Sequence, residues 1–262
     1  MLPKNQKSDF ILVISWWGSK GMYACWILKA IEEFGLKSKI KAIYGVSAGA
    51  LTGAYWLSGR NATAIMENYL KSELFSLKNI ALPPTKSLLK SSVVEKLLKN
   101  DLKKTFEQLE KPLIIGTTDL WKGKSVFFDS WSLIPPVMGS MAVPGIFEPV
   151  EYEKHLLVDG GVTNNFPIDY ARKQHPNAKM MGILLGKFKT NQKVKNLVDT
   201  LMISYEILLR GRLNPTLNEA DLLFYRNFST GVFENNEKKL IQLFEQGYQD
   251  GKTTFSSLKN NV

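Results

Sequence analysis

In the first sixty residues, the pattern of apolar and polar positions alternates between that of a strand and that of a helix. Phe10–Trp17 is a short continuous apolar run, rich in β-branched and aromatic residues, which is typical of a strand buried on both faces. Apolar residues then recur at helical spacing up to Phe34, where Gly35 supplies a stop signal. A second strand is predicted over 41–44 and a second helix over 48–57. This order, with short turns, predicts a parallel sheet with helices packed on it.

The rest of the chain continues the mixed pattern. Residues 60–111 have a helix-like sequence pattern, which Pro83-Pro84 interrupts. Further strands are predicted over 113–117, 125–128, 156–158 and 180–185, and further helices over 196–209 and 238–248, the last leading into a polar tail. Four aromatic residues at helical spacing are expected in the core: Trp26, Phe34, Tyr55 and Trp56. No repeat or Gly/Ser linker divides the chain, so we expect one α/β domain over 1–262, with its core at about 10–257 and a mainly parallel central sheet between helices.

Charge changes this picture in one respect. The formal net charge is +10, which favours anionic partners, although a basic and inert surface would have the same charge. Nine lysines stand against five acids over 71–111. This segment therefore either contacts an anionic membrane from outside or is a solvated helical face. Nucleic-acid binding rests on charge alone and ranks last.

The N-terminal sequence bears on the cellular compartment of the protein, and the single cysteine bears on its disulfide and metal chemistry. The apolar run after Lys4 and Lys7 loosely imitates a signal peptide, but Gly18 and Lys20 interrupt it before any cleavage point. No stretch approaches the ~20 apolar residues that a spanning helix needs. We therefore expect a cytoplasmic protein, with at most peripheral membrane contact. Cys25 is the only cysteine, which excludes an intrachain disulfide and a thiolate metal cluster.

The strongest local motif is Gly45-Val-Ser47-Ala-Gly49, which stands between a predicted strand and a helix of small residues. A serine on that sharp turn projects its hydroxyl outward, and the glycines leave room for the strained backbone. The positive end of the helix favours a developing oxyanion at the same place. The alternative is a structural serine in a tight turn.

A serine nucleophile needs a base, and histidine is scarce. His155 and His175 are the only two, and both are expected at the surface in positions that do not suit a base. Asp159-Gly-Gly161 instead follows an apolar strand directly, where a carboxylate can reach into a crevice. An ordinary Asp-Gly turn is the alternative.

These motifs together resemble the patatin-like phospholipases, especially the bacterial type. Four further segments agree with that family and extend the resemblance over about 10–257: Thr118-Asp-Leu120, Ser140 to Pro149 (S-x-x-x-P-x-x-F-x-P), Asn165-Phe-Pro167 and Gly247-Tyr248. The resemblance implies a three-layer patatin-like sandwich and acyl-ester hydrolysis by a Ser47–Asp159 dyad through an acyl-serine intermediate. It implies a lipid or acyl-ester substrate and neither a metal nor an organic cofactor. No acidic loop suggests a calcium site.

One family motif departs from the pattern. The family has G-G-G-x-[KR]-G after the first strand, and residues 16–21 read W-W-G-S-K-G. By resemblance, Trp17 and Gly18 supply the N–H groups of an oxyanion hole and Lys20 the adjacent cation. Backbone N–H groups do not depend on the side chain, but a positive φ at Trp16 or Trp17 would cost about 1–2 kcal/mol.

Two rival functions follow. The tryptophans favour a catalytically impaired patatin-fold protein that serves as a lipid-binding or interaction module, whereas the retained Ser47 and Asp159 favour an enzyme. Acyl transfer to another acceptor is the second rival, but acyltransferases with a related turn pair serine with histidine, which is scarce here.

Overall fold

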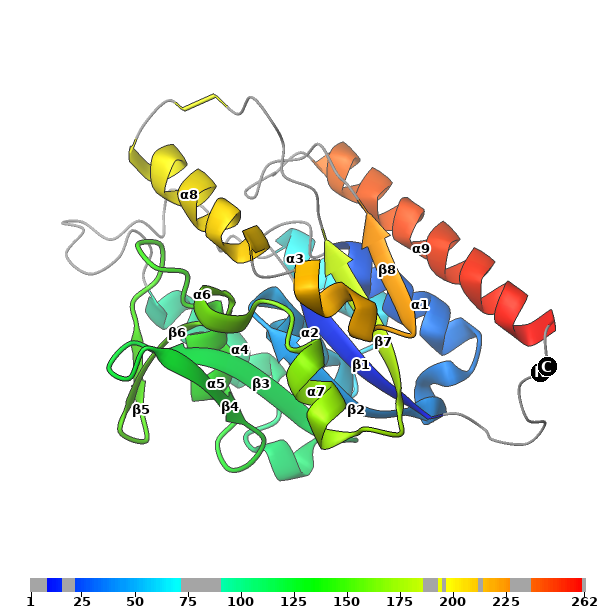
Figure 1. The fold of residues 1–262 in the computed structure, drawn as a ribbon, viewed down its shortest axis with the longest axis horizontal. Coiled ribbons are helices and arrows are strands. Elements are labelled where there is room, and N and C mark those ends of the chain that lie inside the picture. The colour runs from blue at the N-terminus through cyan, green and yellow to red at the C-terminus, as the bar shows by residue number, and fades with distance from the viewer. Residues whose placement is uncertain are drawn as a thin grey trace.

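The computed structural model describes residues 9–15, 22–71, 91–185, 193–194, 197–211, 214–226 and 237–260. Its centre is an eight-stranded mixed sheet flanked by helices (Figure 1). The strands are β1 (Phe10–Ser15), β2 (Ile40–Val46), β3 (Leu113–Asp119), β4 (Lys124–Phe128), β5 (Val150–Tyr152), β6 (His155–Asp159), β7 (Lys179–Leu185) and β8 (Leu222–Arg226).

The sheet has a parallel part and an antiparallel part. Strands β3, β2, β1, β7 and β8 run parallel in that order, whereas β4, β6 and β5 pair in antiparallel fashion. The prediction of a mainly parallel central sheet is confirmed. Strands β4 and β6 of the antiparallel part correspond to the strands predicted over 125–128 and 156–158, although their pairing was not predicted. The short strand β5 was not predicted, because three residues of mixed polarity carry no periodic signal.

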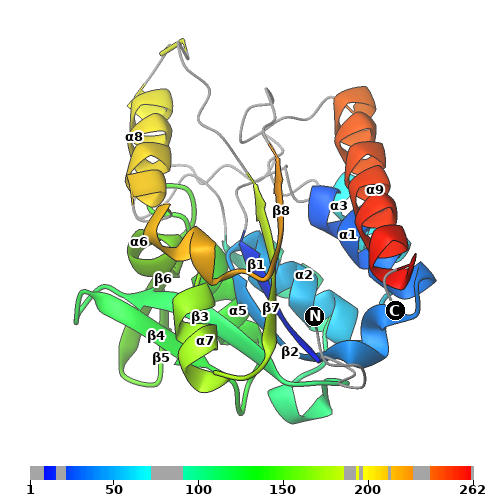
Figure 2. The same cartoon turned by 45° about the vertical axis from the view of Figure 1, so that its right-hand side comes forward.

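Helices cover both faces of the sheet, as Figures 1 and 2 show. They are α1 (Met22–Glu33), α2 (Ala48–Leu57), α3 (Ala62–Lys71), α4 (Ser91–Asp101), α5 (Ile134–Met141), α6 (Gly161–Asn164), α7 (Ile168–Gln174), α8 (Leu197–Gly211) and α9 (Glu237–Asn260), with 3-10 turns η2 (Leu36–Lys39), η4 (Phe106–Gln108) and η5 (Asn214–Glu219). Leu12 and Ile14 of β1 face the larger core cluster, which contains α1 and α2, and Ile11 and Val13 face the smaller one, which includes α7. The strand is therefore buried on both faces, as its continuous apolar run predicts.

Helix α9 extends through the segment expected to be a polar tail. Gly247 and Gly251 let it approach α1, because an added Cβ would stand 2.7 Å from the Tyr23 carbonyl oxygen and 2.6 Å from Ala30 Cβ, respectively. Phe255, with 1% of its surface exposed, anchors the later turns. The helix continues because of this tertiary contact with α1. Of the helices in the described part of the chain, none is both long and apolar enough to cross a bilayer.

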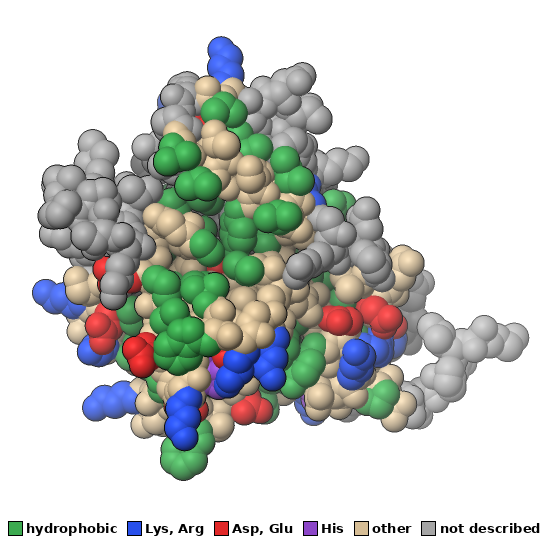
Figure 3. Space-filling view, turned by 60° about the vertical axis from the view of Figure 1, so that its left-hand side comes forward, with side chains coloured by type: hydrophobic (Ala, Val, Ile, Leu, Met, Phe, Trp, Pro, Cys, Tyr) green, Lys and Arg blue, Asp and Glu red, His purple; other side chains and the backbone are tan. Residues whose placement is uncertain are grey.

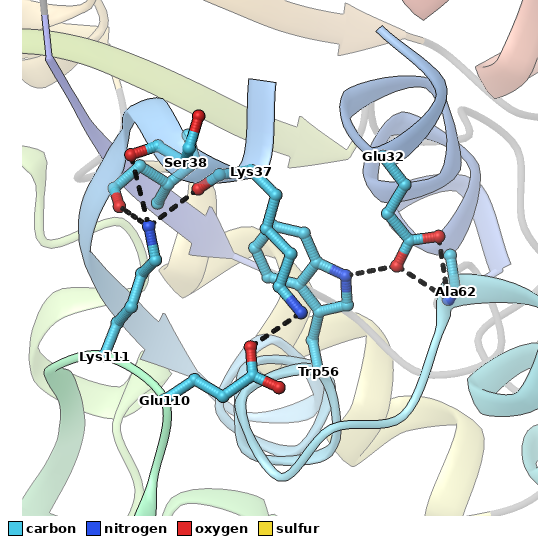
Figure 4. A network of polar contacts seen from close by, with 8 residues as sticks. Glu32, Lys37, Ser38, Trp56, Ala62, Glu110 and Lys111 are labelled. Atoms are coloured by element: carbon cyan, nitrogen blue, oxygen red, sulfur yellow. Dashed lines mark hydrogen bonds and ion pairs between the residues drawn. The ribbon is translucent and has the colours of Figure 1, made fainter. Parts of the chain in front are cut away.

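A network of polar contacts holds the C-terminal end of α2 (Figure 4). The indole N–H of Trp56 donates to Glu32 at 2.6 Å, and the same carboxylate accepts from the Ala62 N–H at 3.1 Å. Lys111, from the lysine-rich segment, donates to three backbone carbonyls, those of Lys37, Ser38 and Ile40. The Trp56–Glu32 contact thus fixes the C-terminal end of α2, which is buried along its whole length and whose first residue follows Ser47, and Lys111 fixes the turn before β2.

The N-terminal end of α2 lies directly against the sheet, and glycine makes this possible. A Cβ on Gly49 would stand 2.2 Å from the carbonyl oxygen of Ile14, and one on Gly45 would stand 2.7 Å from Ala50 Cα. Both obstacles are backbone atoms, which cannot move aside without shifting a strand or a helix. The two glycines of the nucleophile motif are therefore required by the packing of α2 on β1 and β2.

We expect Gly49→Ala to lower the free energy of unfolding by about 3 kcal/mol or more, because the added methyl overlaps β1. Gly53→Ala is the matched control in the same helix: its Cβ would meet only the side-chain ends of Leu113 and Ile43, at 3.0 and 3.2 Å. Urea unfolding of both variants measures the difference. Equal losses would contradict the close approach at Gly49.

Candidate active site

Two strands of opposite direction meet end to end beside β3. Strand β4 occupies one edge of β3 over residues 115–119. On the other edge β2 pairs up to Val46↔Gly116, and β6, running the opposite way, pairs down to Asp159↔Thr117. The C-terminal ends of β2 and β6 therefore face each other at adjacent positions of β3. Ser47 follows the end of β2 and Asp159 is the end of β6, so the two predicted residues come together.

The backbone of Ser47 has the strained conformation that the motif predicts. Its φ is 56° and its ψ is −129°, a region that costs a non-glycine residue about 1–3 kcal/mol. Although Ser47 is the N-cap residue of α2, its hydroxyl makes no capping hydrogen bond to that helix. The hydroxyl instead lies close enough to Asp159 to lower the pKa of that carboxyl.

Ser140 holds the strained turn through a hydrogen bond to its backbone. The N–H of Ser47 donates to Ser140 Oγ at 2.8 Å, and this hydroxyl in turn donates to the Gly116 carbonyl at 2.7 Å. Ser140 is fully buried in α5, so the relay ties α5, β3 and the turn together. The sequence marked Ser140 only as the start of a family segment. Its role depends on a contact between residues 93 positions apart, which no local signal reveals.

Asp159 is a buried carboxylate, with 1% of its surface exposed. Its Oδ1 accepts a hydrogen bond from the Gly161 N–H at 2.7 Å. Burial raises its pKa to about 6, against the lowering effects of the Ser47 hydroxyl, the Gly161 N–H and the Tyr205 hydroxyl. The carboxylate is thus ionised at neutral pH while remaining more basic than an ordinary aspartate.

The two glycines after Asp159 are required by crowding. A Cβ on Gly160 would stand 2.3 Å from the Gly116 carbonyl oxygen. One on Gly161 would meet Leu209 Cδ2 at 2.8 Å, Asp159 Oδ1 at 2.9 Å and the Tyr205 hydroxyl at 3.2 Å. The segment is therefore a close approach of three elements, and more than an ordinary Asp-Gly turn.

Tyr205 is the site residue that sequence reasoning missed. It lies on α8, and its hydroxyl is buried beside Asp159. Burial and then the negative charge of Asp159 raise the pKa of Tyr205 well above its usual value, so the phenol stays protonated. In the sequence, Tyr205 has the spacing of an ordinary core aromatic in an amphipathic helix.

The two histidines lie away from the dyad, and both are partly buried, whereas they were expected at the surface. His155 is partly buried at the start of β6, with its Nδ1 2.7 Å from Asp119 Oδ2. Asp159 lies four positions further along the same strand, about 13 Å away. His175 is partly buried after α7, with its Nε2 3.1 Å from the Tyr44 hydroxyl. Each ring lies beside a polar side chain, Asp119 or Tyr44, that is itself buried by the packing of strands and helices.

The proposed oxyanion-hole residues Trp17, Gly18 and Lys20, and Trp16 beside them, lie outside the described residues. No cluster of three or more His, Cys, Asp or Glu side chains suited to a metal ion occurs within the described ranges. What the described part of the site provides is a serine on a strained turn, a basic buried carboxylate and a phenol donor. This combination is suited to proton transfer from a serine hydroxyl.

Comparisons with known proteins show what this chain resembles in sequence and in fold. The chain is 31% identical over 167 residues to Neuropathy target esterase sws of Drosophila melanogaster, covering 60% of this chain and 12% of that protein. Among solved structures, VipD from Legionella pneumophila superposes with a TM-score of 0.61 at 14% identity, covering 96% of this chain and 67% of that one. The type III effector protein ExoU superposes with a TM-score of 0.53 at 15% identity, covering 95% and 53%.

At these identities the two solved structures show a common fold with this chain. This is the patatin fold, as the expected three-layer sandwich predicts. The chain spans about an eighth of the length of the esterase relative that it matches. The profile of the family described as Patatin-like phospholipase matches residues 18–172, which include both Ser47 and Asp159 and make up more than half of the chain. The chain therefore belongs to the patatin-like phospholipase family.

Proposed function

We propose that this protein hydrolyses lipid acyl esters with Ser47 as nucleophile and Asp159 as general base. The observation that carries the proposal is the end-to-end meeting of β2 and β6, which brings a serine on a strained turn beside a buried carboxylate. The family supports a lipid or ester substrate, since its description is phospholipase and a relative is an esterase.

The chemistry proceeds in two halves. Asp159 accepts the proton of Ser47 as Oγ attacks the ester carbonyl, and the resulting tetrahedral intermediate collapses to an acyl-serine. The departing alcohol takes the proton from Asp159. In the second half Asp159 takes a proton from water as the water attacks the acyl-serine. Asp159 then returns this proton to Ser47 Oγ as the fatty acid leaves, which regenerates the free serine and the ionised carboxylate. The N–H groups of Trp17 and Gly18 would hold the oxyanion, as expected from the family motif.

The pKa of Asp159 suits this role. A general base is most effective when its pKa lies near the working pH, because it is then mostly ionised and still a good proton acceptor. The value of about 6 meets both conditions at neutral pH, whereas an ordinary aspartate would be a weak acceptor.

A catalytically impaired, lipid-binding protein is the second candidate, motivated by Trp16 and Trp17 in place of glycines. Labelling with a fluorophosphonate probe separates the two, because only an activated serine with a working oxyanion hole reacts. The strained Ser47 backbone favours the enzyme, since the conformation has a stability cost that a purely structural turn does not need.

Ser47→Ala and Asp159→Asn should each reduce hydrolysis of p-nitrophenyl esters by about 10³-fold or more, because the two groups act as one unit. The histidine variant His155→Asn/His175→Asn is the control and should stay within about tenfold of wild type, since neither ring is the base. Substantial activity in either dyad variant would refute the dyad.

The acid side of the pH–rate profile should report Asp159. We expect kcat/KM on a soluble ester to fall as the pH drops through about 6, where the carboxylate becomes protonated. Tyr205→Phe removes a hydroxyl that lowers the pKa of Asp159, so this limb should move to higher pH. A loss of activity with no movement of the limb would show that Tyr205 acts only in packing.

Keeping Asp159 ionised should cost stability. Its folded pKa lies above the unfolded value of 3.8, so the native state favours the neutral carboxyl, and stability is lost as the pH rises through about 6. Asp159→Asn resembles the neutral form. At pH 8 its free energy of unfolding, measured with urea, should therefore exceed that of wild type by roughly 1–3 kcal/mol. The difference should shrink toward pH 4.5. A pH-independent difference would contradict this account.

A further inference from the structure

The outer face of α8 has an unusual composition for a solvent-exposed helix face. It consists of Leu197, Thr200, Leu201, Ser204, Ile207 and Leu208, all exposed and none charged. The four aliphatic side chains have 73%, 52%, 52% and 70% of their surface exposed, respectively. At 3.6 residues per turn these six positions lie within an arc of about 120°. In a chain with 22% charged residues, a face of this kind is suited to burial against something apolar.

The charged residues of α8 occupy its other sides. Asp199 is partly buried, and Glu206 is buried and accepts a hydrogen bond from Arg210 at 2.9 Å. The inner face presents Met202, Tyr205 and Leu209 to the protein. The helix is thus divided into an inner face that reaches Asp159 and an outer face that is apolar and exposed. One helix diameter, about 10 Å, separates the two.

The turn between β3 and β4 extends this surface. Leu120 and Trp121 have 47% and 56% of their surface exposed, and Lys122 and Lys124 beside them are also exposed. Helix α6 connects the turn to α8: it packs on α8, and Thr163 Oγ1 lies 2.8 Å from the Thr118 hydroxyl and accepts from Ser125 Oγ at 2.8 Å. Figure 3 looks at this side, where hydrophobic side chains gather over the upper and central part and most lysines and arginines lie below.

We infer that the outer face of α8 and the turn 120–124, together called the docking face, bind the surface of an anionic phospholipid bilayer. The inference deepens the proposed function and rests on it. A chargeless aliphatic helix face can lie in the interfacial plane of a membrane, a tryptophan prefers the headgroup level, and adjacent lysines contact anionic headgroups. A net charge of +10 favours the same partner.

Continuity with the candidate site selects a lipid as the occupant. Tyr205 on the inner side of α8 lies beside Asp159, so a bilayer docked on the outer side would lie about one helix diameter from the candidate site. A protein partner would gain nothing from this closeness to Asp159. Tyr205 and the outer leucines share one helix, so lipid contact also bears on the segment that contacts the base.

Vesicle sedimentation tests the docking face, using Ser47→Ala as the parent so that no lipid is hydrolysed. Added to that parent, Leu201→Ser/Leu208→Ser should weaken binding to mixed phosphatidylcholine–phosphatidylglycerol vesicles by about tenfold or more, because two aliphatic side chains no longer enter the interface. Ile241→Ser is the matched control: Ile241 is 36% exposed on α9, on the other side of the molecule in Figures 1 and 2, and its loss should leave binding unchanged.

A pair of charge reversals tests the lysines. Lys122→Glu/Lys124→Glu should abolish most of the preference for anionic over neutral vesicles, whereas Lys103→Glu/Lys104→Glu, the same charge change in the basic segment 71–111, should keep it. The opposite result would assign the anionic contact to that basic segment and overturn the docking face. Circular dichroism confirms that each variant is folded.

Two further results would overturn the inference. The first is wild-type binding by folded Leu201→Ser/Leu208→Ser. The second is a dimer in size-exclusion chromatography that this variant alone converts to monomer, because a second copy would then cover the face. Failure of the proposed function is separate: full esterase activity of Ser47→Ala would refute the dyad and leave vesicle binding as measured.

Discussion

The site depends on how two strands share one edge of β3. Strand β2 ends at Val46 and β6 ends at Asp159, and since they approach from opposite directions, their ends meet at adjacent registers of β3. Residues 112 positions apart in the chain are thereby held close by backbone hydrogen bonds to the same strand. No flexible loop contributes to the distance between Ser47 and Asp159. Such a site is more precisely positioned than one built on loops.

The surrounding structure holds conformations that would not persist alone. Ser47 has a positive φ, and Asp159 is a carboxylate removed from water; each costs stability. Ser140 fixes the turn through its hydrogen bond to the Ser47 N–H, and the Gly161 N–H donates to Asp159. The buried helix α2, held at its far end by the contacts of Trp56 and Glu32, supplies the rigid support. Strain at the site is thus balanced by packing elsewhere.

Helix α8 connects this rigid centre to the outside. Its inner side places Tyr205 at the carboxylate, and its outer side is apolar and exposed. One face of this fifteen-residue helix therefore lies against a buried polar site, and the other face is apolar and exposed. The polar residues Glu206 and Arg210 pair with one another on the sides between them, which leaves both faces free of unpaired charge.

Local pattern determined much of this protein. The bounds of α2 and the stop at Gly35 agree with the sequence, and β2 (Ile40–Val46) contains the strand predicted over 41–44, because helix and strand periods and glycine signals act over a few residues. Ser47 and Asp159 were found from short motifs for the same reason. Tertiary structure alone decided the antiparallel part of the sheet, the extension of α9 along α1, the relay through Ser140 and the approach of Tyr205 to Asp159. Each of these depends on a contact between residues far apart in the chain, whose free energy exists only after the intervening elements have packed.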